Sequence, residues 1–168
     1  MIQDISPYRL DTAYRGTAPV PDDCFFSFRG EDVLLRDMGD GHRSLPSFRD
    51  LGHPAGKMES RAVFLFRAGR EPVYLLGQEV SGCRGLGYFP ICELKDVLPE
   101  WVFFAGATAL HLSRWYEGNR YCGRCGGRME RKPGQRTLAC PECGNTVYPG
   151  IVPVVMVAVT DGDRLLMT

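Results

Sequence analysis

The sequence predicts an α+β protein with three parts in series. Short apolar runs separated by turn residues occupy the first hundred residues and predict a small antiparallel sheet. A helical repeat of apolar residues follows Pro99, and two Cys-x2-Cys pairs follow that helix. We therefore expect an N-terminal domain over 1–120 that ends in a connecting helix, a metal ribbon over 121–148, and a third part over 149–168.

Two pairs of apolar runs predict the sheet. Residues 24–28 and 33–35 flank a polar turn at 29–32, and residues 62–66 and 73–76 flank a glycine-bearing loop at 67–72. The stretch 36–60 between the two hairpins is rich in Gly, Asp, Pro and His, so we expect it to be mostly loop.

The connecting helix is predicted from about Pro99 to Glu117. Proline suits the first turn of a helix, and the apolar residues then recur at spacings of three and four. Gly118 and Asn119 follow and are typical of a helix end.

Four cysteines then form the most specific motif of the chain. They are Cys122, Cys125, Cys140 and Cys143, and the spacing is that of a structural zinc site with four thiolate ligands. Glycine or asparagine follows each pair and tolerates the positive φ of a tight knuckle. Two disulfides, or one redox-active pair, are the alternatives.

The other three cysteines, Cys24, Cys83 and Cys92, lie far apart in apolar surroundings and are expected to be small core residues. His42 and His53 fall in the predicted loop without a companion carboxylate pattern, so we do not expect them to form a site.

Composition and charge limit the function classes. The 168 residues are 44% hydrophobic and carry 20 basic and 20 acidic side chains, which is ordinary globular usage and gives no global attraction to nucleic acid or membrane. The longest apolar stretch, 152–159, is far too short to span a bilayer, and residues 1–7 lack the features of a secretory signal. We expect a cytoplasmic protein without membrane contact, in which the thiols stay reduced.

The ribbon itself is locally basic. Six Arg or Lys side chains between Arg120 and Arg136 face only Glu130 and Glu142. Simple solvation of a thiolate site and phosphate binding are both compatible with this excess.

The C-terminal residues predict a hairpin. Apolar runs at 154–159 and 165–167 flank an Asp-Gly-Asp turn at 161–163, which is a strong hairpin signal. A sheet of one hairpin leaves open edges and an uncovered apolar face. We therefore expect the chain to be a truncated product or a fragment.

The order of these motifs resembles a known family. It is carried by the segments 114–117 (Arg-Trp-Tyr-Glu) and 120–126 (Arg-Tyr-Cys-Gly-Arg-Cys-Gly), the second cysteine pair, Tyr148-Pro149 and the apolar strand from Val152. This is similar to the NAD(H) diphosphatase, or NADH pyrophosphatase, branch of the Nudix hydrolases, best over 85–168. The resemblance implies a degenerate Nudix-like N-terminal domain, a zinc ribbon and the first hairpin of a catalytic Nudix domain.

The resemblance also implies chemistry. Members hydrolyse the pyrophosphate of NAD(H) to nicotinamide mononucleotide and AMP, some remove NAD caps from RNA, and Mg²⁺ or Mn²⁺ bound by glutamates of the Nudix box is required. It further implies a homodimer, with Tyr148 helping to bind the base. Packing of Tyr148 between ribbon and next strand is the alternative role.

The Nudix box does not occur in these 168 residues. The nearest acidic region, 93–100, has Glu93, Asp96 and Glu100 without the Arg-Glu-x-x-Glu-Glu core. We expect this chain alone to be inactive and assign it no catalytic residue. Two other hypotheses remain, a nucleic-acid-binding zinc ribbon and a non-catalytic dimerisation scaffold.

Overall fold

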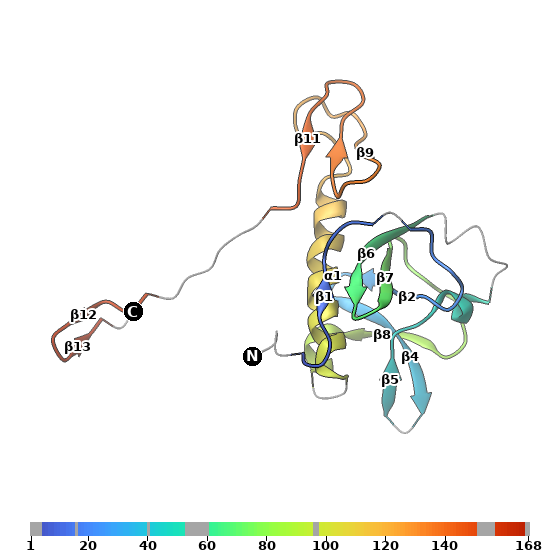
Figure 1. Cartoon of the computed structure of the whole chain (residues 1–168), viewed down its shortest axis with the longest axis horizontal. Coiled ribbons are helices and arrows are strands. Elements are labelled where there is room, and N and C mark those ends of the chain that lie inside the picture. Colours follow the sequence, from blue (N-terminus) through green and yellow to red (C-terminus); the bar gives the residue numbers. More distant parts are fainter. Residues whose placement is uncertain are drawn as a thin grey trace.

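The computed structural model describes residues 5–15, 17–39, 41–52, 61–95, 98–150 and 157–166. Two sheets and one long helix form the N-terminal part, and the ribbon lies at the C-terminal end of that helix (Figure 1). The α+β class predicted from the sequence is confirmed.

The first sheet has the strand order β1-β6-β7-β2 and is mixed. Its strands are β1 (Leu10–Asp11), β2 (Cys24–Phe26), β6 (Ala62–Ala68) and β7 (Glu71–Leu76). The β6–β7 hairpin is the predicted one, with Gly69 at φ 64° in its turn. The pairing of β2 with β7 is parallel, so a purely antiparallel sheet was a wrong expectation here.

The second sheet is built around one long central strand. It comprises β3 (Phe28–Arg29), β4 (Asp32–Gly39), β5 (His42–Ser44) and β8 (Leu86–Pro90), and β4 pairs antiparallel with the other three. The predicted hairpin at 29–32 is confirmed by the β3–β4 pairing. The prediction that 36–60 is mostly loop was wrong for the first part of this stretch. There, β4 continues to Gly39 and β5 pairs antiparallel with it. A short 3-10 helix, η1 (Phe48–Leu51), follows.

The chain passes from the first sheet to the second at Ser27. This serine is fully buried between β2 and β3, and its hydroxyl lies 2.9 Å from the carbonyl of Gln78, to which it donates, and 3.0 Å from the hydroxyl of Tyr88. A buried hydroxyl needs such partners because an unpaired polar group in the interior is costly. These hydrogen bonds fix the point at which the chain passes from β2 in the first sheet to β3 in the second.

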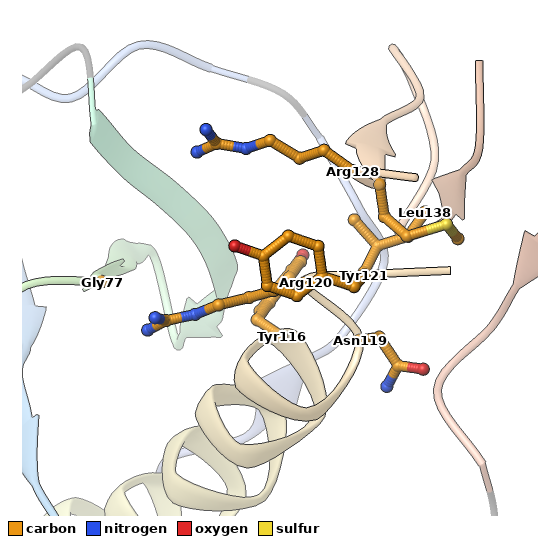
Figure 2. A pocket seen from close by; sticks show the side chains of 8 residues that line it. Gly77, Tyr116, Asn119, Arg120, Tyr121, Arg128 and Leu138 are labelled. Atoms are coloured by element: carbon orange, nitrogen blue, oxygen red, sulfur yellow. The ribbon is translucent and has the colours of Figure 1, made fainter. Parts of the chain in front are cut away.

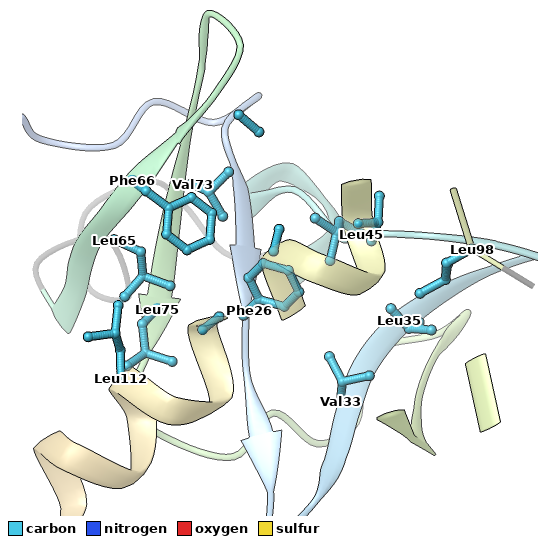
Figure 3. Packing of buried hydrophobic residues seen from close by; sticks show 14 of the residues in the cluster. Phe26, Val33, Leu35, Leu45, Leu65, Phe66, Val73, Leu75, Leu98 and Leu112 are labelled. Carbon is cyan, nitrogen blue, oxygen red and sulfur yellow. The ribbon is translucent and has the colours of Figure 1, made fainter. Parts of the chain in front are cut away.

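The helix α1 (Glu100–Gly118) closes the main core, as predicted within one residue at each end. Val102, Ala105, Ala109 and Leu112 recur every three or four residues, so they share one face, which packs on both sheets around Phe26 (Figure 3). Gly106 allows α1 to approach the 3-10 helix η3 (Ile91–Leu94) closely. A Cβ at this position would lie only 3.1 Å from Cδ1 of Ile91. A second buried cluster, which includes Phe25, Phe64 and Tyr74, lies among the other side chains of the same strands.

The C-terminal hairpin is confirmed only in its described part. Strands β12 (Thr160–Asp161) and β13 (Arg164–Leu165) pair antiparallel around Gly162, whose φ is 56°. The apolar run predicted from Val154 and the end at Met167 lie partly outside the described residues. None of the described helices has the length and apolar character needed to cross a membrane.

Candidate metal centre and the adjoining pocket

Two nearly identical knuckles carry the four cysteines. In the first, the N–H of Cys122 donates to the carbonyl of Gly127 at 2.8 Å, and the N–H of Gly126 returns a 2.8 Å bond to the carbonyl of Cys122. The second repeats this, from Cys140 to Asn145 at 2.8 Å and from Gly144 back to Cys140 at 3.0 Å. Gly126 and Gly144 have φ values of 78° and 72°, which explains the glycine in each knuckle.

A small sheet holds the two knuckles together. Its strands are β9 (Glu130–Arg131), β10 (Leu138–Ala139) and β11 (Thr146–Val147), and β10 lies between the other two in antiparallel pairing. Since β10 runs directly into Cys140, and β9 follows the first knuckle, the sheet sets the two cysteine pairs face to face.

The sulfur positions fit a tetrahedral zinc ion. All four Sγ atoms lie within 4.8 Å of one another, with Cys122 and Cys143 at 3.6 Å and Cys125 and Cys140 at 3.4 Å. Four Zn–S bonds of about 2.3 Å in a tetrahedron require sulfurs about 3.8 Å apart, whereas a disulfide bond requires about 2.05 Å. The disulfide alternative does not agree with these distances, and all seven cysteines are free in the structure.

Backbone donors make the site suited to thiolates. The N–H of Arg124 donates to Sγ of Cys122 at 3.4 Å, and this bond, helped by Nδ2 of Asn145 at 3.5 Å, lowers the pKa of Cys122 to about 6. The N–H of Gly127 lowers the pKa of Cys125 as well, but the neighbouring sulfurs of Cys140 and Cys143 outweigh it and raise that pKa to about 12. Four thiolates therefore need a cation between them to coexist.

The ribbon is seated on the end of α1. Its buried apolar side chains, Met129 and Leu138, pack with the two buried cysteines against Trp115 and Tyr116. The helix ends where both the backbone N–H and the side-chain amide of Asn119 donate to the carbonyl of Trp115.

The predicted substrate residue Tyr148 lies where the ribbon ends. Nε1–H of Trp115 donates to the carbonyl of Tyr148 at 3.1 Å, so its backbone is tied to the helix. Tyr148 is 61% exposed.

Arg136 joins the ribbon to the N-terminal domain, which the sequence did not reveal. The β6–β7 pairing shifts register between Phe64 and Phe66, and the carbonyl of the intervening Leu65 accepts a hydrogen bond from Nη2 of Arg136. The guanidinium also lies 5.9 Å from the ring of Tyr14, and burial lowers the pKa of Arg136. Arg136 is thus not a solvated member of the basic ribbon surface.

A pocket of about 420 Å³ opens beside the ribbon, between the end of α1 and the loop after β7 (Figure 2). It is lined by Gly77, Tyr116, Asn119, Arg120, Tyr121, Arg128, Met129 and Leu138. Burial raises the pKa of Tyr116 to about 12, although Arg136 and Arg131 act in the opposite direction. The sequence signal for this pocket is the arginine excess, but the spacing alone did not show which arginines share a cavity.

The remaining cysteines are only partly as predicted. Cys24 and Cys83 are half-buried beside the first and the second core cluster, but Cys92 is exposed, so its assignment to the core was wrong. His42 is exposed, and His53 lies outside the described residues.

Comparison with known proteins agrees with the ribbon geometry. Residues 119–148 match the family model of the NADH pyrophosphatase zinc ribbon domain. The NAD-capped RNA hydrolase of Deinococcus radiodurans is 32% identical over 145 residues, which are 84% of this chain and 47% of that protein. The NAD-capped RNA hydrolases of Stutzerimonas stutzeri and Pseudomonas fluorescens Pf-5 are 36% and 37% identical over 101 and 103 residues, each 58% of this chain and 36% of the relative. The chain thus spans half or less of the length of these relatives.

Proposed function

Because this chain carries the zinc ribbon of the NADH pyrophosphatase branch of the Nudix hydrolases and is related to that branch along most of its length, we propose that it is the zinc-binding N-terminal portion of an NAD(H) diphosphatase. The observation that carries the proposal is the four-sulfur cluster seated on the end of α1, in the segment that the ribbon model matches. The substrate class would be NAD⁺, NADH or the NAD cap of an RNA, and the bond broken would be the pyrophosphate.

The zinc would be structural in this proposal. All four ligand positions are filled by cysteine sulfurs, so no position is left for a water or a substrate. The chemistry itself would need Mg²⁺ or Mn²⁺ bound by the glutamates of a Nudix box, which these 168 residues do not contain. A reducing compartment such as the cytoplasm would keep the four thiols available for the metal.

An activity assay of the 168-residue chain tests this division of roles. We expect NADH with Mg²⁺ to yield no AMP above a blank without protein, as measured by chromatography. Clear turnover that EDTA abolishes would contradict the proposal, because catalysis would then reside in residues to which we assign none.

Tyr148 is the residue for which we propose a direct substrate contact. Its backbone carbonyl is bound by Trp115 and its ring is exposed, so the ring is available to stack on a flat base. Because stacking on one aromatic ring contributes about 1–3 kcal/mol, Tyr148→Leu is expected to weaken NADH binding by about 5-fold or more. Tyr8→Leu, which removes another exposed tyrosine, is the matched control in a fluorescence titration. Equal affinities of wild type and Tyr148→Leu would exclude the contact.

A homodimer is the assembly that we propose. Tyr148, Leu165 and Leu166 are large and exposed, and side chains of this kind favour association. Sedimentation velocity over a range of concentrations is expected to show the dimer, and a monomer throughout would contradict it. A dimer that binds no NADH would favour the scaffold hypothesis instead.

A further inference from the structure

We infer that the pocket between α1 and the ribbon binds a nucleotide of a single-stranded RNA, with its phosphate between Arg120 and Arg128 and its base against Tyr121. The inference deepens the proposed function and rests on it for the choice of RNA over other polyanions. It concerns a strand-binding subsite that is separate from the cysteine cluster.

The two arginines give the pocket its charge. Arg120 and Arg128 both line it, and Figure 2 shows their side chains extending in the same direction, with Tyr121 between them in this view. Arg120 has an ion pair with Glu117 at 3.7 Å, but both side chains are more than 60% exposed, so this pair is weak and leaves the guanidinium available. Guanidinium groups are the usual partners of phosphate oxygens because they donate two parallel hydrogen bonds.

The rest of the lining leaves this positive charge uncompensated. Among the described residues that line the pocket, none is acidic, and Glu117 is the carboxylate paired with one of them. The half-buried Tyr116 and the buried Met129 and Leu138 give the same lining an apolar part, which together with the arginines suits a ligand with a flat apolar part and an anionic part.

Tyr121 supplies the stacking surface. Its side chain is 68% exposed although the residue directly precedes a metal ligand, and its backbone is fixed by a bridge to Arg128. Stacking of single bases on aromatic side chains together with arginine contacts to the backbone is the usual mode of single-strand binding. A volume of about 420 Å³ is sufficient for one nucleotide, whereas a duplex would not present an unstacked base to it.

Fluorescence anisotropy with a labelled 12-nucleotide single-stranded RNA tests the inference. For the zinc-loaded 168-residue chain with Arg120→Gln and Arg128→Gln combined, we expect at least 10-fold weaker binding at low salt. The slope of log K against log salt concentration should become shallower by about 0.7, since the pocket neutralises one phosphate and each neutralised phosphate of a single strand contributes about 0.7. Tyr121→Leu should weaken binding by about 5-fold or more and leave the slope unchanged.

Arg124→Gln combined with Lys132→Gln is the matched control. Both side chains are exposed on the same ribbon and lie outside the pocket lining, and the change in charge is identical. We expect less than a 3-fold effect, with one zinc per chain and an unchanged thermal transition in every variant. A loss in the control as large as in the pocket variant would overturn the inference in favour of diffuse attraction.

The RNA-binding experiment and the tests of the NAD(H) diphosphatase proposal can fail separately. Failure of the wild-type chain to bind the RNA, or equal binding by the pocket variant, would overturn the subsite. The AMP assay and the NADH titration would still decide the proposed function, because neither involves an RNA strand. Tighter binding of a duplex than of the single strand would also overturn the inference.

Discussion

The N-terminal domain and the ribbon are stabilised in different ways. The domain has two clusters of buried aromatic and aliphatic side chains between its sheets and α1. In the described ribbon, by contrast, the buried apolar side chains other than the cysteines are Met129 and Leu138. A core of that size cannot offset the loss of chain entropy, so the ribbon depends on its metal and on its seat at the helix end.

Removal of the metal is expected to have the largest effect, and it should separate the two regions. Cys140→Ser, at a buried ligand, should abolish zinc binding and unfold the ribbon, because apparent binding free energies of structural zinc sites are about 10–16 kcal/mol and include the folding free energy. Hydrogen exchange should show lost protection over 121–148 and retained protection in β6, β7 and α1.

Cys92→Ser is the matched control for this change, because Cys92 is an exposed cysteine outside the cluster. It should keep one zinc per chain by elemental analysis. If Cys140→Ser lost hydrogen-exchange protection in the N-terminal domain as well as in the ribbon, the domain would have no stability of its own.

The reverse perturbation is a cavity in the domain core. Leu65→Ala removes a fully buried side chain and is expected to cost about 2–5 kcal/mol of unfolding free energy. Met38→Ala, at an exposed side chain, should change it by less than about 0.5 kcal/mol. Urea denaturation measures both, and zinc content should remain at one per chain. Loss of zinc from Leu65→Ala in its folded state would contradict separate sources of stability.

The helix α1 and the cysteine knuckles of the ribbon were predictable from the sequence, because both depend on the spacing of residues that lie close together in the chain. The 3.6-residue repeat placed α1 within one residue, and two Cys-x2-Cys pairs specify the knuckles by themselves. The strands β5 and β8 were not predicted. In β8, Gly87 and Pro90 interrupt the strand pattern, and its pairing with β4 joins residues that are 50 to 58 positions apart.

The connection between the two regions was equally hidden. Arg136 donates to the carbonyl of Leu65, which lies 71 positions earlier in the chain, at the register shift between β6 and β7. No pattern of neighbouring residues in the sequence predicts such a bond. The pocket could not be predicted for the same reason. Gly77 and Arg128 are distant in the sequence and line one pocket because the ribbon packs on the end of α1.

Arg136→Met tests how strongly the two regions are coupled. It removes the hydrogen bond to Leu65 but keeps much of the apolar stem, and leaving that carbonyl unpaired should cost about 1–3 kcal/mol. Lys132→Met is the control at an exposed position of the ribbon. We expect the backbone amides around position 136 to exchange hydrogen faster in Arg136→Met than in Lys132→Met, while both variants retain their zinc. Identical exchange in both variants would show that the Arg136 bond contributes nothing to the coupling.

The smallest effect is expected for a surface ion pair within the domain. Arg114 of α1 lies 2.5 Å from Glu31 of the β3–β4 turn, and both side chains are at least half exposed. Arg114→Met should cost less than about 1 kcal/mol in urea denaturation, since exposed pairs are screened by water. A cost comparable to that of Leu65→Ala would show that burial alone does not hold α1 on the sheets.

X-ray absorption at the zinc edge tests the central claim most directly, namely that a four-thiolate metal replaces a core in the ribbon. The purified chain should contain one zinc with four sulfur scatterers at about 2.3 Å and no nitrogen or oxygen ligand. A spectrum with fewer than four sulfurs, a site that holds iron, or a folded ribbon without metal would contradict it.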